Sequence, residues 1–326
     1  MILAIETSCD ETSVAVICDG KIVSNELFSQ IKHHASFGGV VPELASRLHA
    51  EYIDLILDKA LTAAQVDLNQ IRHIAVTAGP GLEGALLVGI MAARSLGQLL
   101  NIPVIGVNHL HGHIFAAMQE ADIQYPALVC IASGGHTMLI RMDHPVDFSI
   151  LANTMDDACG EAFDKVARML DLGYPGGPKV EALALKGQVN VDLPHPVYHQ
   201  DDAFSFSGLK TAVLQVIQSN QNKKEDIASS FQHRVATILA HKINRHMAQF
   251  TPKQVILCGG VFANQAIRSY LFNQLESVDV VVPSLNLCTD NAGMIGLAAS
   301  VYLKHQQVGP FVCSPQLGLR FLNHAY

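Results

Sequence analysis

The alternation of hydrophobic and polar positions predicts the same succession of elements in both halves of the chain. Short apolar runs bounded by polar turns are typical of β-strands. They occur in two groups of three, at residues 2–7, 12–18 and 21–29 and again at residues 127–132, 136–142 and 148–153. Apolar residues at helical spacing follow each group, at residues 42–63 in the first half and at residues 161–170 and 178–185 in the second. This repetition indicates an internal duplication.

A strand, a glycine-rich loop and a helix then recur in both halves. The first set comprises a strand at 73–77, the loop Gly79-Pro80-Gly81 and a helix at 85–100; the second comprises a strand at 254–257, the loop Gly259-Gly260 and a helix ending near Glu276. Each half closes with one further strand and a helical segment, at residues 103–107 and 109–113 and at residues 278–283 and 289–302. Strands alternating with helices predict an α/β protein. The duplication predicts two similar lobes with a central ligand cleft.

The two lobes are expected to meet within residues 121–126. This boundary gives an N-terminal lobe of residues 1–123 and a C-terminal lobe of residues 124–326. The second lobe is longer because it carries an insertion near residues 187–221.

Composition limits the classes of protein to consider. Of the 326 residues, 49% are hydrophobic, yet no apolar run reaches the about 18 residues that a membrane-spanning helix needs. The chain opens on a strand pattern rather than a signal peptide, and its 7 cysteines stand singly without a CxxC pair. These features predict a cytoplasmic protein without a disulfide framework. The net charge of −8 argues against an extended basic face, so any nucleic-acid role needs a local patch or a basic partner.

Three histidines alternate in the segment His109-Leu110-His111-Gly112-His113. On a helix, His109 and His113 lie about 40° apart on one face, whereas His111 lies about 200° round from His109. Two imidazoles on one face form a bidentate site for a divalent transition metal, which needs at least one further ligand. His111 is therefore placed outside the site.

The duplication indicates where the missing ligand lies. Asp290, near the start of the closing helix of the second half, occupies the position that matches the histidine segment of the first half. Its carboxylate either caps that helix or faces the cleft. If the lobes face each other, His109, His113 and Asp290 converge on one metal from opposite sides. Two histidines and a carboxylate suit iron(II) or zinc.

Glycine-rich loops at strand ends before helices favour a nucleotide site over simple tight turns. No Gly-Lys-Ser/Thr sequence follows these loops, so none is a P-loop. Asp10 and Glu11 occupy a hairpin turn in which kinases with paired lobes keep a glycine for phosphate. Two acids there would repel a γ-phosphate, which favours a nucleotide without a triphosphate to transfer. Lys210, near a helix start, is a candidate anion contact.

Together these segments resemble the TsaD/Gcp/YgjD/Kae family of tRNA adenosine threonylcarbamoyltransferases. The match follows the order of the chain and covers nearly all of it. It is carried by Ile5-Glu6-Thr7-Ser8-Cys9-Asp10-Glu11-Thr12, Gly79-Pro80-Gly81-Leu82, His109-x3-His113, Ser133-Gly134-Gly135-His136-Thr137, Gly160-Glu161-Ala162-Phe163-Asp164-Lys165, Tyr174-Pro175-Gly176-Gly177, Phe206-Ser207-Gly208-Leu209-Lys210, Gly259-Gly260-Val261-x2-Asn264 and Thr289-Asp290-Asn291-Ala292.

The resemblance implies an ASKHA fold, that of actin-like and ribonuclease-H-like proteins. It implies an enzyme that transfers the threonylcarbamoyl group from threonylcarbamoyl-adenylate to N6 of the adenosine at position 37, beside the anticodon, in tRNAs reading ANN codons, with release of AMP. It also implies one divalent metal held at His109, His113 and Asp290, with Fe²⁺ favoured and Zn²⁺ the alternative. Implied partners are tRNA, a TsaB-like paralogue and a TsaE-like ATPase, with no membrane.

Further site residues follow from the same resemblance. Substrate contacts are expected in the second half, at Ile131, Ala132, Ser133, Gly134, Gly135, Asp164, Gly177 and Asn264. Asp10 and Glu11 are candidate catalytic residues, because a positioned carboxylate could take the proton that the adenine amine loses. Lys32, His33, His34 and Arg47 are candidates for local basic contacts with tRNA.

Three other classes of protein fit the sequence less well. A metal-dependent glycoprotease would need the H-E-x-x-H pattern, but Leu110 stands where that pattern has its general-base Glu. A sugar or acyl kinase conflicts with the acidic Asp10-Glu11 turn. A non-catalytic ASKHA scaffold subunit would be expected to lack the histidine pair and the Thr-Asp-Asn segment, and this chain has both.

Overall fold

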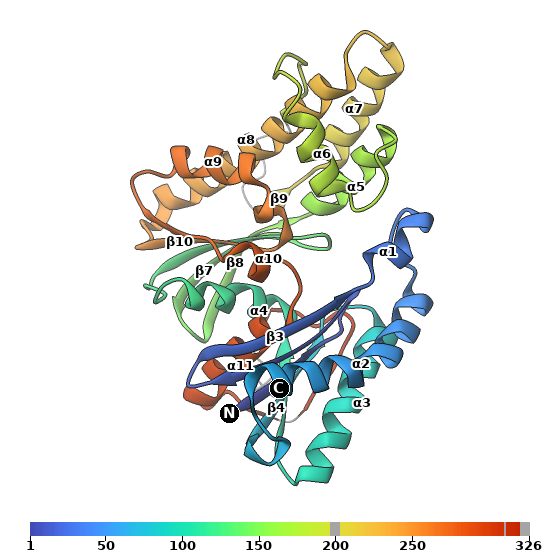
Figure 1. The fold of residues 1–326 in the computed structure, drawn as a ribbon. Helices are drawn as coiled ribbons and strands as arrows, with labels where there is room; N and C mark the ends of the chain where they lie inside the picture. The colour runs from blue at the N-terminus through green and yellow to red at the C-terminus, as the bar shows by residue number, and fades with distance from the viewer. Residues whose placement is uncertain (196–202, 310, 320–326) are drawn as a thin grey trace. The chain divides into compact units, whose positions relative to one another are not determined.

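The computed structural model describes residues 1–195, 203–309 and 311–319. The chain divides into two compact units (Figure 1). Unit 1 comprises Met1–Asp122 together with the chain from Thr289 onward, and unit 2 comprises Ile123–Cys288. The C-terminal lobe was expected to comprise residues 124–326, but the part from Thr289 onward belongs to unit 1. The helix that follows Thr289 is buried on nearly every side, and it packs on the strands of unit 1.

The sheet of unit 1 has the strand order β3-β2-β1-β4-β5. Its strands are β1 (Ile2–Glu6), β2 (Glu11–Cys18), β3 (Lys21–Ser29), β4 (His73–Gly79) and β5 (Val104–Asn108). The two hairpin pairs are antiparallel, and β4 and β5 run parallel to β1. The predicted strands are confirmed, with ends that shift by one or two residues.

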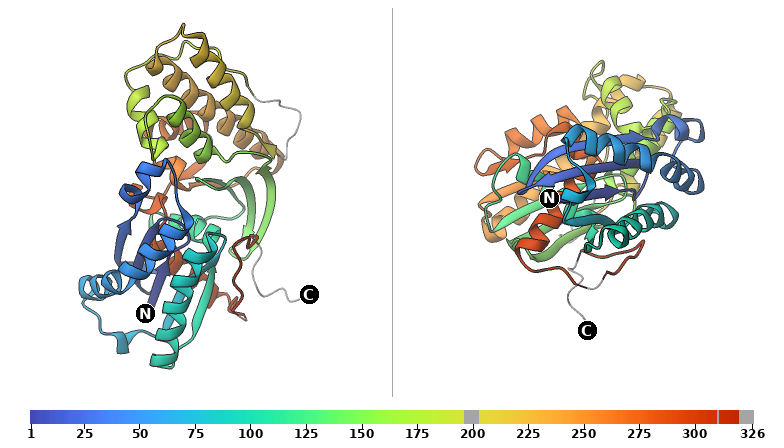
Figure 2. Two further views of the ribbon diagram at one scale, coloured as in Figure 1. Left: turned by 90° about the vertical axis from the view of Figure 1, so that its right-hand side faces the viewer. Right: turned by 60° about the horizontal axis from the view of Figure 1, so that its bottom comes forward.

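Helices cover both faces of this sheet. They are α1 (Ile31–His34), η1 (Ala35–Phe37), α2 (Pro42–Ala64), η2 (Leu68–Gln70), α3 (Glu83–Leu100), α4 (His109–Phe115), η3 (Ala116–Gln119) and α11 (Ala292–Lys304). Helices α2 and α3 lie side by side on one face, while α11 crosses the other, as Figures 1 and 2 show.

The alternation of side chains along β1 links this layering to the functional site. Leu3 and Ile5 point into the core that α2 and α3 cover. Ala4 points the other way, since a Cβ added at Gly296 of α11 would lie 3.1 Å from its Cβ. Successive strand residues face opposite sides, so Glu6 shares the face of Ala4. A carboxylate therefore lies under α4 and α11.

Unit 2 repeats the topology of unit 1. Its strands are β6 (Ala127–Ala132), β7 (Thr137–His144), β8 (Asp147–Thr154), β9 (Ala203–Phe204), β10 (Gln254–Cys258) and β11 (Asp279–Val281), in the order β11-β10-β6-β7-β8-β9. Apart from β9, this order matches unit 1 strand for strand. The predicted duplication is confirmed.

The helices of unit 2 are α5 (Cys159–Met169), α6 (Gly176–Ala184), α7 (Ser207–Ser219), α8 (Lys224–Phe250), η4 (Gly260–Ala263), α9 (Gln265–Gln274) and α10 (Leu285–Cys288). They enclose a core in which Phe163, Phe206 and Phe231 pack with the apolar side of the sheet. The predicted insertion contains β9 and α7, while its residues 196–202 lie outside the described residues.

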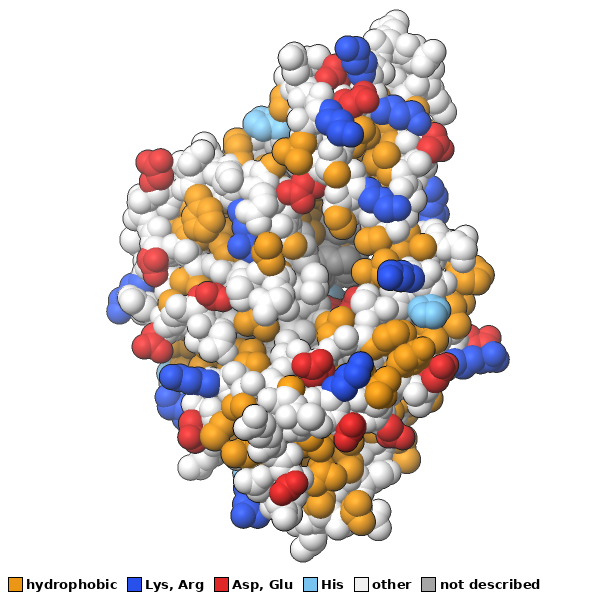
Figure 3. Space-filling view, in the orientation of Figure 1, with side chains coloured by type: hydrophobic (Ala, Val, Ile, Leu, Met, Phe, Trp, Pro, Cys, Tyr) orange, Lys and Arg blue, Asp and Glu red, His pale blue; other side chains and the backbone are white. Residues whose placement is uncertain are grey.

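Two surface properties bear on the expected partners. Within the described residues, no helix has both the length and the hydropathy that a membrane crossing requires. On the face shown in Figure 3, acidic and basic side chains are interspersed, without one extended basic region.

A candidate metal centre and a glycine-rich ligand site

Helix α4 carries the histidine pair and begins where β5 ends. The side chain of Asn108 accepts a hydrogen bond of 2.9 Å from the backbone N–H of Leu110, which caps the helix. The rings of His109 and His113 lie edge to face with centroids 4.8 Å apart. Both side chains are almost fully buried. The predicted helical spacing therefore presents both imidazoles on one side.

Asp290 completes the group. Its Oδ1 atom lies 3.4 Å from Nε2 of His109 and 3.2 Å from Nε2 of His113. Asn291, one residue later, caps α11 by accepting a 3.0 Å hydrogen bond from the N–H of Met294. Asp290 is thus not the helix cap, and its carboxylate is available to the histidines.

All three residues belong to unit 1, which corrects the expectation that Asp290 approaches from the opposite lobe. The reason is that α11 packs against α4 and β1 instead of closing the second lobe. The convergence of His109, His113 and Asp290 comes from packing within one unit.

The donor set fits a divalent cation. The three ligand atoms lie within 4.8 Å of one another, so the group could hold a metal ion. The ring of His113 is buried, and apart from the 3.2 Å approach of Asp290 to Nε2, neither of its nitrogens has a hydrogen-bond partner among the described residues. Burial disfavours charge on His109, but Asp290 and Glu6 outweigh it and raise its pKa well above the usual value. Burial alone would raise the pKa of Asp290; the two histidines lower it instead. The carboxylates in and beside this group thus favour a positive charge between them, as on a bound cation.

Glu6, at the end of β1, was not among the site residues that the sequence predicted. Its Oε2 atom lies 3.1 Å from Nδ1 of His109 and accepts a 2.6 Å hydrogen bond from Thr77 Oγ1. Its Oε1 atom accepts from the N–H of Ser8, whose Oγ lies 3.1 Å from the same Nδ1. A carboxylate on the far nitrogen of a metal-binding histidine fixes the ring orientation and tautomer. The signal in the sequence that could have indicated Glu6 is that it is the one acidic residue of an otherwise apolar strand.

His111 lies outside the group, as its predicted direction required. Its Nδ1 lies 2.5 Å from the hydroxyl oxygen of Tyr302, and its Nε2 lies 2.6 Å from the carbonyl oxygen of Leu319. Burial lowers the pKa of His111 to about 4, against the opposing effect of the Leu319 carbonyl. The ring is therefore neutral and links three segments of unit 1.

Residues 311–319, called here the C-terminal strap, lie along the ends of β4 and β5. The N–H of Ser314 donates to the carbonyl oxygen of Ala78 at 2.9 Å, and the side-chain amide of Asn108 donates to that of Gly318 at 2.6 Å. Gly79 has φ +136°, and a Cβ there would lie 1.9 Å from the carbonyl oxygen of Ser314. Only glycine fits this approach. The strap thus contacts the residues that precede and separate the histidine pair.

The acidic turn follows β1 in the same unit. Asp10 is buried, and its carbonyl oxygen accepts a 2.9 Å hydrogen bond from the N–H of Gln30. Burial and the neighbouring carboxylates of Asp10 and Asp290 raise the pKa of Glu11 well above its usual value. Of the two predicted catalytic acids, Glu11 therefore interacts electrostatically with both Asp10 and the metal group.

The predicted substrate contacts all lie in unit 2. Ile131 and Ala132 end β6 and are fully buried. The loop that follows turns tightly, because the N–H of Ser133 donates to the carbonyl oxygen of His136 at 2.8 Å. A Cβ at Gly134 or Gly135 would meet open space. The backbone of this loop is accessible to a ligand.

Small residues let other segments approach this loop. A Cβ at Gly160, in the first turn of α5, would lie 2.6 Å from the carbonyl oxygen of Ser133. A Cβ at Gly259, where φ is +102°, would lie 2.5 Å from that of Ala132. The carboxyl ends of β6 and β10 and the start of α5 therefore meet at one edge of unit 2.

The remaining predicted contacts have structural partners. Asp164 accepts a 2.7 Å hydrogen bond from the N–H of Gly176, while a Cβ at Gly177 would meet open space. Asn264 caps α9 through Ile267 and donates to Gln232 Oε1 at 2.6 Å. Its side chain therefore holds the turn after β10.

Lys210, the candidate anion contact, is paired within the protein. Its Nζ lies 2.7 Å from Asp157, which also binds Lys165. This pairing favours a structural role for Lys210.

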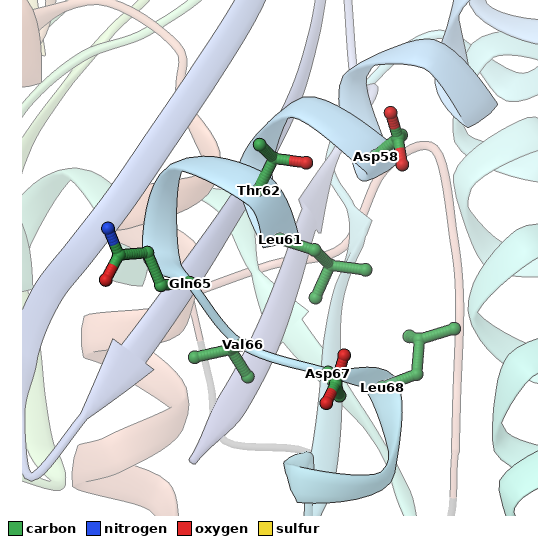
Figure 4. Close-up of a pocket in the computed structure, with 7 residues that line it drawn as sticks. All are labelled: Asp58, Leu61, Thr62, Gln65, Val66, Asp67 and Leu68. Carbon is green, nitrogen blue, oxygen red and sulfur yellow. The ribbon is translucent and has the colours of Figure 1, made fainter.

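A shallow surface pocket at the end of α2 is distinct from both sites. It is lined by Asp58, Leu61, Thr62, Gln65, Val66, Asp67 and Leu68, as Figure 4 shows. None of these residues belongs to either candidate site.

The duplicated units define the class of protein. The chain has the ASKHA fold, which solved structures share at low sequence identity. HypF of T. kodakarensis gives a TM-score of 0.66 at 15% identity, covering 93% of this chain and 48% of that one. The (R)-2-hydroxyglutaryl-CoA dehydratase component A of Acidaminococcus fermentans gives 0.57 at 17% identity, covering 94% and 98%.

Sequence comparison then gives the family. The model of the family described as TsaD, tRNA N6-adenosine threonylcarbamoyltransferase, matches residues 21–297. The protein of that name from Bacillus subtilis is 45% identical over 99% of this chain and 96% of its own length. The one from Halalkalibacterium halodurans is 46% identical over 94% and 92%. This chain belongs to the tRNA N6-adenosine threonylcarbamoyltransferase family, as the sequence motifs indicated.

Proposed function

We propose that this protein transfers the threonylcarbamoyl group from threonylcarbamoyl-adenylate to N6 of adenosine 37 in tRNAs reading ANN codons, releasing AMP. Family membership supports the reaction class. The observation that carries the proposal is the group of His109, His113 and Asp290, in which both histidines are buried and Asp290 is partly exposed. The acidic Asp10-Glu11 turn, which does not suit a γ-phosphate, lies next to this group.

The donor is a mixed carbamic–phosphoric anhydride. The N6 amine attacks the carbamoyl carbon, the bond from that carbon to the phosphate oxygen breaks, and AMP leaves with the electron pair. The amine loses one proton, and Glu11 is our proposed acceptor. Burial and the neighbouring carboxylates raise its pKa, and a raised pKa makes a carboxylate a stronger base. Asp10 shares the turn, and its charge adds to the effect of burial on that pKa.

The metal would be held by His109, His113 and Asp290, with iron(II) favoured over zinc. When bound, such an ion can polarise or anchor the donor. Glu6 holds the ring of His109 in position, and burial shields both histidine rings from bulk solvent.

In unit 2, the exposed backbone N–H groups of Gly134 and Gly135 are proposed to bind the phosphate of the donor. The N–H of Ser133 donates to His136 and closes the loop that presents them. Asp164 and Gly177 would contact its ribose and base. Asn264 would act by holding the turn after β10, since both ends of its amide are already hydrogen-bonded. Backbone at Ile131 and Ala132 would complete this surface.

The test is reconstitution with tRNA, threonine, bicarbonate, ATP, the donor synthase, and the TsaB-like and TsaE-like partners. Threonylcarbamoyl-adenosine is measured by mass spectrometry, and metal content by elemental analysis. We expect product with tRNA carrying A37 and none with G37. The double variant His109→Ala/Asp290→Ala should lose both product and metal. His73→Ala, which changes a histidine of unit 1 outside the site, is the matched control. Full activity and metal content in the double variant would contradict the proposal.

A further inference from the structure

The segment after β3 exposes aromatic and basic side chains. We call Lys32, His33, Ala35, Ser36 and Phe37 the α1 lip; all five are exposed. Phe37 is 63% exposed, which is unusual for so large an apolar ring. In the region of α1, Figure 3 shows a Lys or Arg side chain and a His side chain among hydrophobic ones. An exposed aromatic ring beside basic side chains suits a partner that can stack on the ring and that carries negative charge.

Contacts of His34 and His33 with neighbouring residues support the α1 lip. The buried His34 contacts Gln30 Oε1 at 3.1 Å through Nε2, and its Nδ1 accepts a 3.3 Å hydrogen bond from the N–H of Val41. The His33 ring lies 6.0 Å from Phe28, which stacks on Tyr52 with ring centroids 3.7 Å apart. These contacts hold the backbone of the segment in place, which lowers the ordering entropy that binding costs.

The α1 lip begins beside the acidic turn. Strand β3 pairs with β2 so that Ser29 lies opposite Glu11, and the N–H of Gln30 donates to the carbonyl oxygen of Asp10 at 2.9 Å. Lys32 follows two residues later. The segment that carries the exposed side chains therefore starts next to the turn that holds our proposed proton acceptor.

The local charge favours an anionic partner. Residues 27–42 contain no Asp or Glu, although the chain has a net charge of −8. The next acid, Glu43, pairs with Arg47 at 2.6 Å. By contrast, the adjoining site contains the carboxylates of Glu6, Asp10, Glu11 and Asp290. A polyanion that approaches these carboxylates is repelled unless cations beside them compensate.

We propose that the α1 lip binds the single-stranded anticodon loop next to the target adenosine. Phe37 stacks on a neighbouring base, Lys32 contacts a backbone phosphate, and His33 supports this contact. Aromatic rings that stack on splayed bases beside a cation are the usual means of gripping single-stranded RNA. The proposal rests on the proposed function, since it takes tRNA as the substrate.

Binding of an anticodon stem-loop RNA to the full chain, measured by fluorescence anisotropy at low salt, tests the α1 lip directly. We expect Phe37→Ala to weaken binding about 5- to 150-fold and Phe37→Tyr to retain it. Lys32→Ala should lower the slope of log affinity against log salt by roughly 0.7. Phe272→Ala, which removes another exposed phenylalanine in unit 2, should bind as wild type. In turnover, Phe37→Ala should raise KM for tRNA and leave kcat and metal content nearly unchanged.

The outcomes separate this proposal from the proposed function. If Phe37→Ala binds the RNA as tightly as wild type, or if the wild-type chain does not bind it, the proposal that the α1 lip binds the anticodon loop is wrong. Loss of activity in Phe37→Ala only when the protein partners are present, with RNA binding intact, would assign the surface to a protein contact and also overturn it. If the protein makes no product but binds RNA in a way that depends on Phe37, the result supports RNA binding by the α1 lip and contradicts the proposed function.

Discussion

The Nδ1 atom of His111 lies 2.5 Å from the hydroxyl oxygen of Tyr302, and both side chains are buried. His111 belongs to α4, which carries two members of the metal group, and Tyr302 belongs to α11, which begins two residues after the third. The histidine that does not join the group therefore connects the two helices that position it.

Tyr302→Phe should weaken both the fold and the metal site. The substitution keeps the ring but leaves Nδ1 of His111 without its buried partner, which costs about 1–3 kcal/mol in the free energy of unfolding. Urea unfolding and competition with a chelator measure the two effects. Tyr52→Phe, in α2 of the same unit, is the control. The double variant with His111→Phe should be less destabilised than the sum of the single changes, and simple additivity would argue against the contact.

Glu6→Gln should reduce metal affinity with little change in shape. The amide retains the size of the carboxylate but lacks the charge that orients and polarises His109. Loss of such a partner typically lowers metal affinity about 10- to 100-fold. Equilibrium dialysis against a competing chelator measures it, and Glu26→Gln in β3 provides a matched change. If Glu6→Gln and Glu26→Gln bind the metal with equal affinity, Glu6 does not contribute to the site.

Asp157 should give unit 2 an acid-sensitive component of stability. Burial would raise its pKa, but hydrogen bonds and charge from Lys165 and Lys210 lower it instead. A carboxyl group with a lowered folded-state pKa stabilises the fold above its unfolded pKa of about 3.9 and loses this effect as the pH falls through the folded value.

The substitution Asp157→Asn should therefore lower the free energy of unfolding near neutral pH, and the difference from wild type should shrink below about pH 4. Urea unfolding at several pH values measures this. The matched variant is Asp143→Asn, whose pair with Arg141 is exposed, and it should change stability by less than about 1 kcal/mol. A difference for Asp157→Asn that does not depend on pH would refute the assignment.

Gly79→Ala should detach the C-terminal strap. The new Cβ would clash with the carbonyl oxygen of Ser314, 1.9 Å away, so the strap must move. Hydrogen exchange should increase in residues 311–319 and in α4, and metal affinity should fall. At Gly20 φ is also positive, at +74°, but a Cβ there would meet no other side chain or backbone segment within 4 Å. Gly20→Ala thus tests backbone strain without the clash, and it should leave the strap protected.

Local sequence determined much of this protein. Strand alternation and helical spacing located the elements of both units, because each pattern depends on neighbouring residues alone. The spacing of His109 and His113 likewise fixed their common face, and it placed His111 elsewhere. The motifs in chain order indicated the family.

Only the tertiary structure decided how these parts combine. Asp290 meets the histidines within unit 1 because α11 packs on β1 and α4. The strand period put Glu6 on one face of β1, yet only the position of α4 above that face made it a partner of His109. The contacts of His111 with Tyr302 and the strap join residues about 200 positions apart. Such contacts leave no local pattern in the sequence, since they arise from the packing of distant segments.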